Sequence, residues 1–171
     1  MQLVYTCLCL AECGVIVAQQ EYGFSKESPI DLKFTLSFFI GCIATYSGAF
    51  LSTCAIRELG RFSIPVRKEH KLVKSGPYAY IRHPIHTGYL LNFIGFLLCL
   101  FTQGSLIREW RVLWSPLVLV VVGVMLALRT IRAMYVFERA VLEDESLRKE
   151  FGREWDMWAE TVRYRILIGI F

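Results

Sequence analysis

Histidine, arginine and proline side chains gather in one short stretch of this chain, immediately before a hydrophobic run. The stretch covers residues 70–89 and reads HKLVKSGPYAYIRHPIHTGY. Polar groups beside hydrocarbon are costly to desolvate, and they persist mainly where they are paired or used. The chemistry of this protein is therefore expected at this junction.

The histidines and the arginine of this stretch suggest two simple kinds of chemistry. His70, His83 and His86 carry imidazole rings, which are good zinc ligands, but no cysteine or acidic residue lies at metal-site spacing from them. Arg82 at a membrane edge could instead bind a lipid phosphate, with the histidines at the same headgroup level. The sequence therefore predicts no metal site, and it leaves simple lipid binding open.

A second polar group lies nearer the C-terminus, in a stretch with helical spacing. Arg139 and Glu143 stand four residues apart, so a helix places them on one face, within reach of each other or of a shared ligand. Glu138, Asp144 and Glu145 make the neighbourhood acidic, which would suit a cationic ligand, although a solvated acidic face shows the same pattern. If this helix leaves the bilayer on the side of the histidines, the pair closes a pocket over them.

The apolar segments around these residues predict a membrane protein. Of the 171 residues, 55% are hydrophobic and 20% are charged, and the mean hydropathy is +0.45, which argues against an ordinary soluble domain. A helix needs about 20 mostly apolar residues to cross the hydrocarbon. Four segments approach that length, namely residues 1–18, 34–56, 85–107 and about 112–129. The first lacks the basic start of a signal peptide, so we expect a membrane helix there.

Basic residues set the expected orientation of these helices. Arginine and lysine are concentrated in residues 57–82, whose only acidic residues are Glu58 and Glu69. Such a basic loop stays on the cytosolic side of a membrane. Counting helices onward from this loop places the tail after about residue 129 on the same side. Both polar regions of the chain are therefore expected to face the cytosol.

The tail is expected to contain two helices. Its first part has apolar residues at helical spacing, and Phe151 and Gly152 should end this helix because glycine commonly terminates helices. Trp155 and Trp158 then alternate with charged residues, a mixture typical of a helix that lies on anionic lipid. The six cysteines are scattered singly, so we expect them to pack as small apolar residues without disulfides.

Two segments, in this order, carry a resemblance to a known family. They are HKLVKSGPYAYIRHPIHTGYLL and, after one hydrophobic hairpin, ERAVLEDESLRKEFGREWDMW. Together, the patterns H-x-L-V, G-x-Y-x-x-x-R-H-P and R-x-x-x-E resemble the C-terminal catalytic region of the isoprenylcysteine carboxyl methyltransferase family. The wider phospholipid methyltransferase group is close to it. The resemblance covers roughly residues 56–165.

This resemblance implies an all-α integral membrane protein with about four transmembrane helices, a cytosolic cofactor-binding loop and C-terminal amphipathic helices. Residues 1–171 would form a single domain, with N-terminal membrane helices in 1–56 and the catalytic region in 57–171. The implied enzyme lies in the endoplasmic reticulum membrane as a multi-pass protein and transfers a methyl group from S-adenosylmethionine to the carboxylate of a C-terminal prenylcysteine. Its implied partners are a prenylated protein or prenylcysteine and membrane lipid, with no nucleic acid.

The resemblance also implies roles for individual residues. The cofactor-binding residues would be His70, Lys71, Leu72, Val73, Tyr78, His83, Pro84, Ile85, His86 and Glu143. Arg139 matches the arginine that the family uses for substrate binding and catalysis. The catalytic set would comprise Arg139, Glu143 and Arg82.

The chain departs from the family pattern at several positions. His86 stands where members usually have tyrosine, and Val141 and Leu142 stand where they carry a longer run of acids. The N-terminal part is also short, although upstream helices of the family form part of the prenyl-binding side. The resemblance therefore predicts methyl transfer more specifically than it predicts the acceptor.

The chemistry expected from these residues depends on the acceptor. A cationic sulfonium would be attracted by the charge of Glu143 and by the ring of Tyr78. A carboxylate acceptor is already ionised and needs only alignment, which Arg139 could supply through paired hydrogen bonds. An amine acceptor must first lose a proton, and Glu143 or His86 would be the base.

Two alternatives therefore stay open beside a prenylcysteine methyltransferase. One is an N-methyltransferase that acts on a phospholipid of the phosphatidylethanolamine type or on another small lipophilic acceptor. The other is a non-catalytic membrane protein whose basic loop binds anionic lipid.

Overall fold

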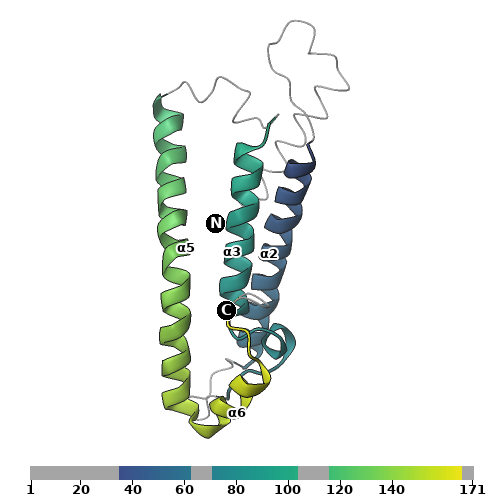
Figure 1. The fold of residues 1–171 in the computed structure, drawn as a ribbon, viewed down its shortest axis with the longest axis vertical. Helices are drawn as coiled ribbons and strands as arrows, with labels where there is room; N and C mark the ends of the chain where they lie inside the picture. The colour runs from purple at the N-terminus through teal and green to yellow at the C-terminus, as the bar shows by residue number, and fades with distance from the viewer. Residues whose placement is uncertain (1–34, 63–70, 104–115, 167–171) are drawn as a thin grey trace, which may run out of the picture. The chain divides into compact units, whose positions relative to one another are not determined.

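Helices are the only regular elements in the residues that the computed structural model describes, which are 35–62, 71–103 and 116–166. They are α2 (Leu36–Phe62), the short 3-10 helix η1 (Gly76–Ala79), α3 (Pro84–Phe101), α5 (Pro116–Phe151) and α6 (Arg153–Thr161) (Figure 1). The described residues contain no strand, so the predicted all-α class is confirmed. The first predicted membrane segment, residues 1–18, and His70 lie outside the described residues.

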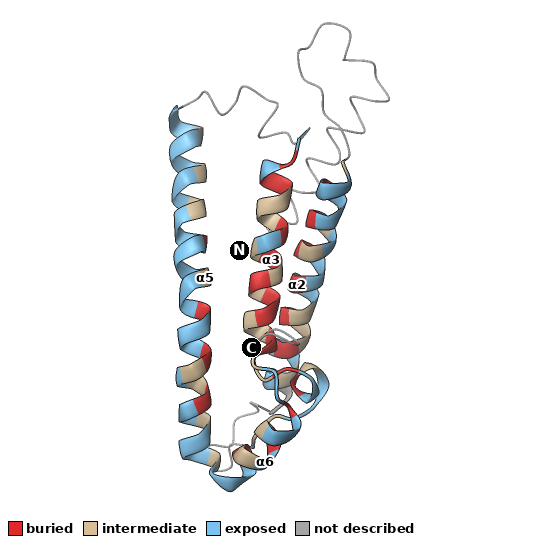
Figure 2. Ribbon diagram, viewed as in Figure 1, coloured by how far each residue is buried: buried red, intermediate tan, exposed pale blue. Residues whose placement is uncertain are grey.

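Three of the described helices are long and apolar enough to cross a membrane. These candidate spans are Leu36–Gly60, Pro84–Phe101 and Leu119–Phe151, and they overlap the second, third and fourth predicted segments. Most side chains of α5 are exposed, as Figure 2 shows, and those of its first half are mainly aliphatic. An aliphatic surface of this kind suits hydrocarbon rather than water. The chain is an all-α membrane protein.

The helices differ from the predicted segments mainly at their ends. α2 continues to Phe62, so the first part of the basic stretch is helical, and α3 already ends at Phe101. α5 runs without a break from the membrane segment into the tail. Arginine, lysine and glutamate are good helix formers, so the end of an apolar run does not end a helix. The hydropathy of the sequence therefore predicted where the membrane spans lie, but it did not predict where the helices begin and end.

The chain divides into two compact units, and the first comprises Met1–Tyr46 and Asn92–Arg129. Within this unit, α2 and α3 approach each other so closely that a side chain on Gly95 could not be accommodated. A Cβ atom there would lie 2.5 Å from the backbone oxygen of Gly41 and 2.5 Å from the backbone nitrogen of Thr45. Small residues permit this approach, as they do in many pairs of membrane helices.

The second unit comprises Ser47–Leu91 and Thr130–Phe171 and contains two hydrophobic clusters. The first cluster joins α2, η1, α6 and the segment after α6 through Ala55, Tyr78, Trp155, Trp158 and Val162. The second joins α3, α5 and the C-terminal segment through Leu90, Val136, Ala140 and Ile166. These clusters hold the start of α3 and the second half of α5 in one packed body.

The turn between α5 and α6 depends on glycine, as the sequence predicts. α5 ends at Phe151, and Gly152 has a φ of 54°, in the left-handed region that glycine adopts without strain. The two tryptophans of α6 differ from the prediction. Trp155 and Trp158 are only 7% and 6% exposed, so the protein buries them and they do not lie on lipid. Tryptophan is common both in cores and at membrane interfaces, so its spacing could not distinguish the two.

Candidate active site

The two described histidines are positioned by the start of α3. Pro84 is the first residue of the helix, where its missing N–H group is not needed. The backbone oxygen of His83 accepts hydrogen bonds from the N–H groups of His86, at 3.0 Å, and Thr87, at 3.1 Å. This first turn brings the rings of His83 and His86 together, with centroids 5.5 Å apart.

The C-terminal segment after α6 returns to the loop that precedes α3. The backbone N–H groups of Arg82 and His83 donate hydrogen bonds to the backbone oxygens of Tyr164 and Arg165, both at 2.9 Å. The side chain of Arg82 also donates through Nη2 to the backbone oxygen of Arg163, at 2.9 Å. The segment therefore fixes the backbone directly beside the histidines.

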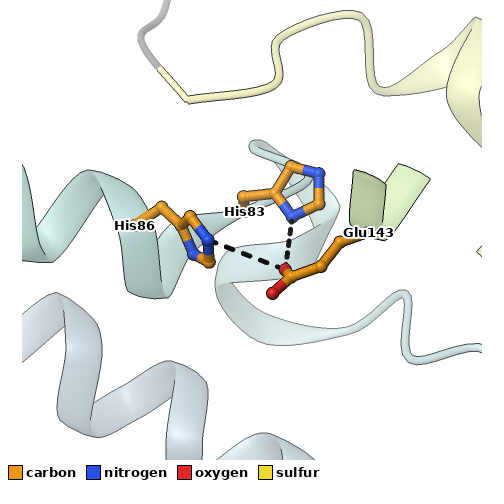
Figure 3. Close-up of side chains that lie close together, drawn as sticks. All are labelled: His83, His86 and Glu143. Atoms are coloured by element: carbon orange, nitrogen blue, oxygen red, sulfur yellow. Dashed lines mark ion pairs between the residues drawn. The ribbon is translucent and has the colours of Figure 1, made fainter. Parts of the chain in front are cut away.

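Glu143 on α5 is the point where the two polar groups of the sequence meet. Its Oε2 lies 3.4 Å from Nδ1 of His83 and 3.7 Å from Nε2 of His86 (Figure 3). Its Oε1 accepts a hydrogen bond from Nε of Arg139 at 2.8 Å, so the expected i,i+4 pair is present. The Glu143 side chain is 36% exposed and that of Arg139 is 73% exposed, which leaves both within reach of a ligand.

His83 lies between two neighbouring carboxylates. Its Nδ1 faces Glu143, and its Nε2 lies 2.9 Å from Oδ1 of Asp144. Burial lowers the pKa of His83, but the hydrogen bonds and charges of Asp144 and Glu143 outweigh it, so that the pKa is raised above its ordinary value. An imidazolium ring can donate from both nitrogens, and this arrangement favours that form.

Asp144 joins three segments of the chain, although sequence reasoning assigned it no role beyond local negative charge. Its side chain is 4% exposed. Oδ2 accepts a hydrogen bond from Nη1 of Arg82 at 2.9 Å and lies 3.0 Å from Nε of Arg165. The signal available in the sequence was its position next to Glu143, because adjacent helical residues point about 100° apart and can flank one ring.

Tyr78 borders this group of side chains from η1. It is 8% exposed, and burial together with the negative charge of Glu143 raises the pKa of Tyr78 to about 12. The phenol is therefore neutral at physiological pH and can act as a hydrogen-bond donor. Other predicted cofactor residues pack against the same hydrophobic cluster, namely Leu72, Val73 and Ile85. Lys71 is exposed.

Arg82, which the sequence predicts as catalytic, is held by the protein itself. Nη1 contacts Asp144, Nη2 contacts the backbone of Arg163, and its Cζ lies 5.8 Å from the ring centre of Trp155. Its side chain is only 10% exposed. These contacts let Arg82 position the loop before α3.

His83, His86 and Glu143 also meet the spacing of a metal site, since one ligand atom from each lies within 4.8 Å of the others. A metal cation bound there would compete with Arg139 for the carboxylate of Glu143. It would also compete with the protons on the ring nitrogens of His83, which face Glu143 and Asp144. The neighbouring charges therefore favour an ion-paired cluster at these three side chains.

The cluster can hold opposite charges side by side. Glu143 presents a carboxylate to a cationic ligand, and Arg139 presents an exposed guanidinium to an anionic one. Nε2 of His86 is buried without a hydrogen-bond partner among the described residues, and a buried polar atom of this kind is usually satisfied by a ligand or water. This arrangement suits a reaction between a cation and an anion.

Comparison with known proteins gives a family for the chain. The family model of phospholipid methyltransferases matches residues 36–154. A probable protein-S-isoprenylcysteine O-methyltransferase of Oryza sativa subsp. indica is 25% identical over 129 residues, which cover 72% of this chain and 58% of the rice protein. The protein-S-isoprenylcysteine O-methyltransferase of Saccharomyces cerevisiae is 36% identical over 112 residues, which cover 63% of this chain and 44% of the yeast protein.

The chain thus spans about half the length of the curated relatives it matches. No solved structure matches it. The family match extends from α2 into α6 and includes His83, His86 and the acidic pair of α5. The names of these relatives are those of the family that the sequence resembles, so the resemblance is confirmed. This chain belongs to the phospholipid methyltransferase family.

Proposed function

We propose that this protein is an S-adenosylmethionine-dependent methyltransferase whose acceptor is the carboxylate of a C-terminal prenylcysteine. The observation that carries the proposal is the convergence of His83, His86 and Arg139 on Glu143. Family membership and the names of the rice and yeast relatives support it. The proposal includes a single domain, residence in the endoplasmic reticulum membrane and a catalytic side that faces the cytosol.

The side chains around Glu143 fit a cationic cofactor. The partly exposed carboxylate of Glu143 would attract a sulfonium, and the buried Nε2 of His86 would gain the partner that it lacks among the described residues. When bound, S-adenosylmethionine supplies an activated methyl group. The residues proposed to hold it are His70, Lys71, Leu72, Val73, Tyr78, His83, Pro84, Ile85, His86 and Glu143.

Arg139 is proposed to bind the acceptor. It contacts Glu143 through Nε, so its outer nitrogens can bind a carboxylate and direct one oxygen toward the methyl group. A carboxylate is ionised at neutral pH, so no general base is required. The reaction then needs alignment and the exclusion of water, which residues on packed helices can provide.

Arg82 would contribute to catalysis as a positioning residue. Its guanidinium is held by Asp144 and by the backbone of Arg163, so it acts on the site through the loop that carries His83. The prenyl chain of the acceptor would remain in the hydrocarbon beside the exposed apolar side chains of α5. Those nearest to Arg139 on its N-terminal side are Met134, Tyr135 and Phe137.

The family match also supports a second candidate, a phospholipid with an amine acceptor. An amine must lose its proton before methyl transfer, whereas a carboxylate does not. The rate with an amine would therefore rise with pH up to the pKa of the amine. The rate with a carboxylate acceptor would show no such rise with pH.

The proposal is tested with purified protein in liposomes, methyl-labelled S-adenosylmethionine and two acceptors, N-acetyl-S-farnesylcysteine and phosphatidylethanolamine. We expect label on the farnesylcysteine as a methyl ester that alkali removes. Label on phosphatidylethanolamine alone would transfer the assignment to the amine-methylating alternative. Label on neither acceptor, with no binding of S-adenosylhomocysteine, would favour the non-catalytic lipid-binding alternative.

A further inference from the structure

α5 carries a second exposed arginine, Arg132, two turns before Arg139. Residues seven apart on a helix lie on nearly the same face. Along this face, Val136 and Ala140 are buried, and they share a cluster with Leu90 of α3. Arg132 therefore continues the side of α5 that packs on α3.

The contacts of Arg132 direct its charge toward the same part of α3. Its Cζ lies 4.7 Å from the ring centre of Tyr89, which is three residues after His86 and hence on a neighbouring part of the same helical face. The charges of Arg139 and Arg132 both act on the ring of His86. Two guanidinium groups of α5 thus lie near the first turns of α3, which carry His86 and Tyr89.

Unlike Arg139, Arg132 has no carboxylate partner in the described part of the chain, and it is exposed. It also lies within the candidate span Leu119–Phe151. A charged side chain in a membrane span is costly, and it is usually kept for a function. The donors of this guanidinium are therefore available to an anionic group that arrives from the membrane.

We propose that Arg132 is a second acceptor-binding residue, which binds the anionic group of the acceptor together with Arg139 and selects anionic acceptors. This inference rests on the proposed function. It adds that the acceptor carries a negatively charged group where Arg132 and Arg139 bind it. The flat guanidinium fork matches both carboxylates and phosphates. The anion would be the reacting carboxylate of a prenylcysteine or, in a phospholipid acceptor, the phosphate.

The first test compares Arg132→Gln, Arg132→Lys and the control Arg153→Gln in liposomes. Arg153 is an exposed residue of α6 with no ion pair among the described residues. Arg132→Gln should raise KM for N-acetyl-S-farnesylcysteine about tenfold or more, as loss of a charge-assisted hydrogen bond implies. Arg132→Lys keeps the charge but loses the forked guanidinium, so its KM should lie between those of the wild type and Arg132→Gln. The KM of the control Arg153→Gln should match that of the wild type.

Cofactor binding separates this role from a merely structural one. The affinity for S-adenosylhomocysteine should change by less than about twofold in Arg132→Gln, because this side chain does not contact Glu143. The carboxamide of the farnesylcysteine serves as a competitive ligand. The wild type should bind the acid more tightly than the amide, and Arg132→Gln should reduce this preference, because only Arg139 then remains to bind the carboxylate.

The outcomes distinguish the inference from the function on which it rests. A wild-type enzyme that methylates farnesylcysteine, with an unchanged KM and acid preference in Arg132→Gln, overturns the inference alone. If the wild type methylates phosphatidylethanolamine instead, the proposed acceptor is wrong, and a raised KM for that lipid in Arg132→Gln still supports anion binding. An unchanged KM for that lipid, or no methyl transfer to either acceptor, overturns the inference as well.

Discussion

At the scale of single residues, one imidazole ring connects the loop before α3 to α5. His83 faces Glu143 with one nitrogen and Asp144 with the other. The two acids then have different environments, since Glu143 is partly exposed and Asp144 is almost fully buried. This difference suggests that Asp144 stabilises the fold, whereas Glu143 remains available to a ligand.

The first prediction concerns the buried acid. Asp144→Asn should lower the free energy of unfolding by about 3 kcal/mol, because removal of one partner leaves buried cations without compensation. Arg82, His83 and Arg165 would all lose an ionised acceptor. Unfolding in detergent micelles, followed by tryptophan fluorescence, measures the change.

Asp156→Asn is the matched control for this substitution. Asp156 pairs with Arg148 at 2.8 Å, but both side chains are well exposed, at 41% and 64%. Exposed ion pairs contribute less than about 1 kcal/mol, so this variant should unfold almost as the wild type does. Equal effects of the two substitutions would contradict the structural role of Asp144.

The second prediction concerns pH. Because the folded protein raises the pKa of His83 above the ordinary value of about 6.5, this residue stabilises the fold fully below that value. The contribution is lost as the pH rises through the raised pKa. His83 faces two acids of α5, Glu143 and Asp144, and the ring of His86 of α3. Asp144 in turn pairs with two arginines, Arg82 and Arg165.

Unfolding of the wild type and of His83→Gln, from about pH 5.5 to about pH 9, measures this contribution. The stability difference between them should shrink with rising pH. The carbon-13 resonances of the histidines measure the pKa of His83 independently. The chain has only three histidines, so their resonances can be assigned. A difference that stays constant or grows with pH would show that the pKa of His83 is not raised.

At the scale of the helices, α2 and α3 depend on close backbone contact. Gly95→Ala should destabilise the protein by about 1–3 kcal/mol, because the new Cβ atom would meet backbone atoms that cannot move aside. These atoms are the oxygen of Gly41 and the nitrogen of Thr45, each 2.5 Å from the Cβ position. Thermal unfolding in micelles measures the effect.

Gly123→Ala is the control within the same set of helices. Apart from the backbone of its own helix turn, no atom of the described residues lies within 4 Å of a Cβ atom at Gly123, and alanine favours helices over glycine by up to about 1 kcal/mol. The control should therefore be neutral or slightly stabilising. A neutral Gly95→Ala would mean that α2 and α3 do not pack as described.

The helices also show how far sequence patterns reach. The apolar runs predicted the three described spans, and Gly152 predicted the end of α5. The burial of Trp155 and Trp158 could not be predicted, because the pattern of α6 is equally typical of a helix on lipid. A pattern within one element records which face is apolar, but not which surface covers that face.

At the scale of the whole molecule, the central expectation from the sequence was that the histidines and the Arg139–Glu143 pair would meet. They do so at Glu143. The role of the C-terminal segment was missed. Backbone hydrogen bonds such as that from Arg82 to Tyr164 join residues far apart in the chain, and such contacts leave no periodic signal in the sequence. The cytosolic orientation of both regions stays a prediction.

The central claim is that Glu143 belongs to a cofactor site and Arg139 to the acceptor. Calorimetric titration with S-adenosylhomocysteine, in the wild type, Glu143→Gln and Arg139→Ala, tests it most directly. We predict that the wild type binds, that Glu143→Gln weakens binding by about tenfold or more, and that Arg139→Ala retains binding while turnover falls about 100-fold. A wild type that does not bind, or equal loss of affinity in both variants, would contradict the account.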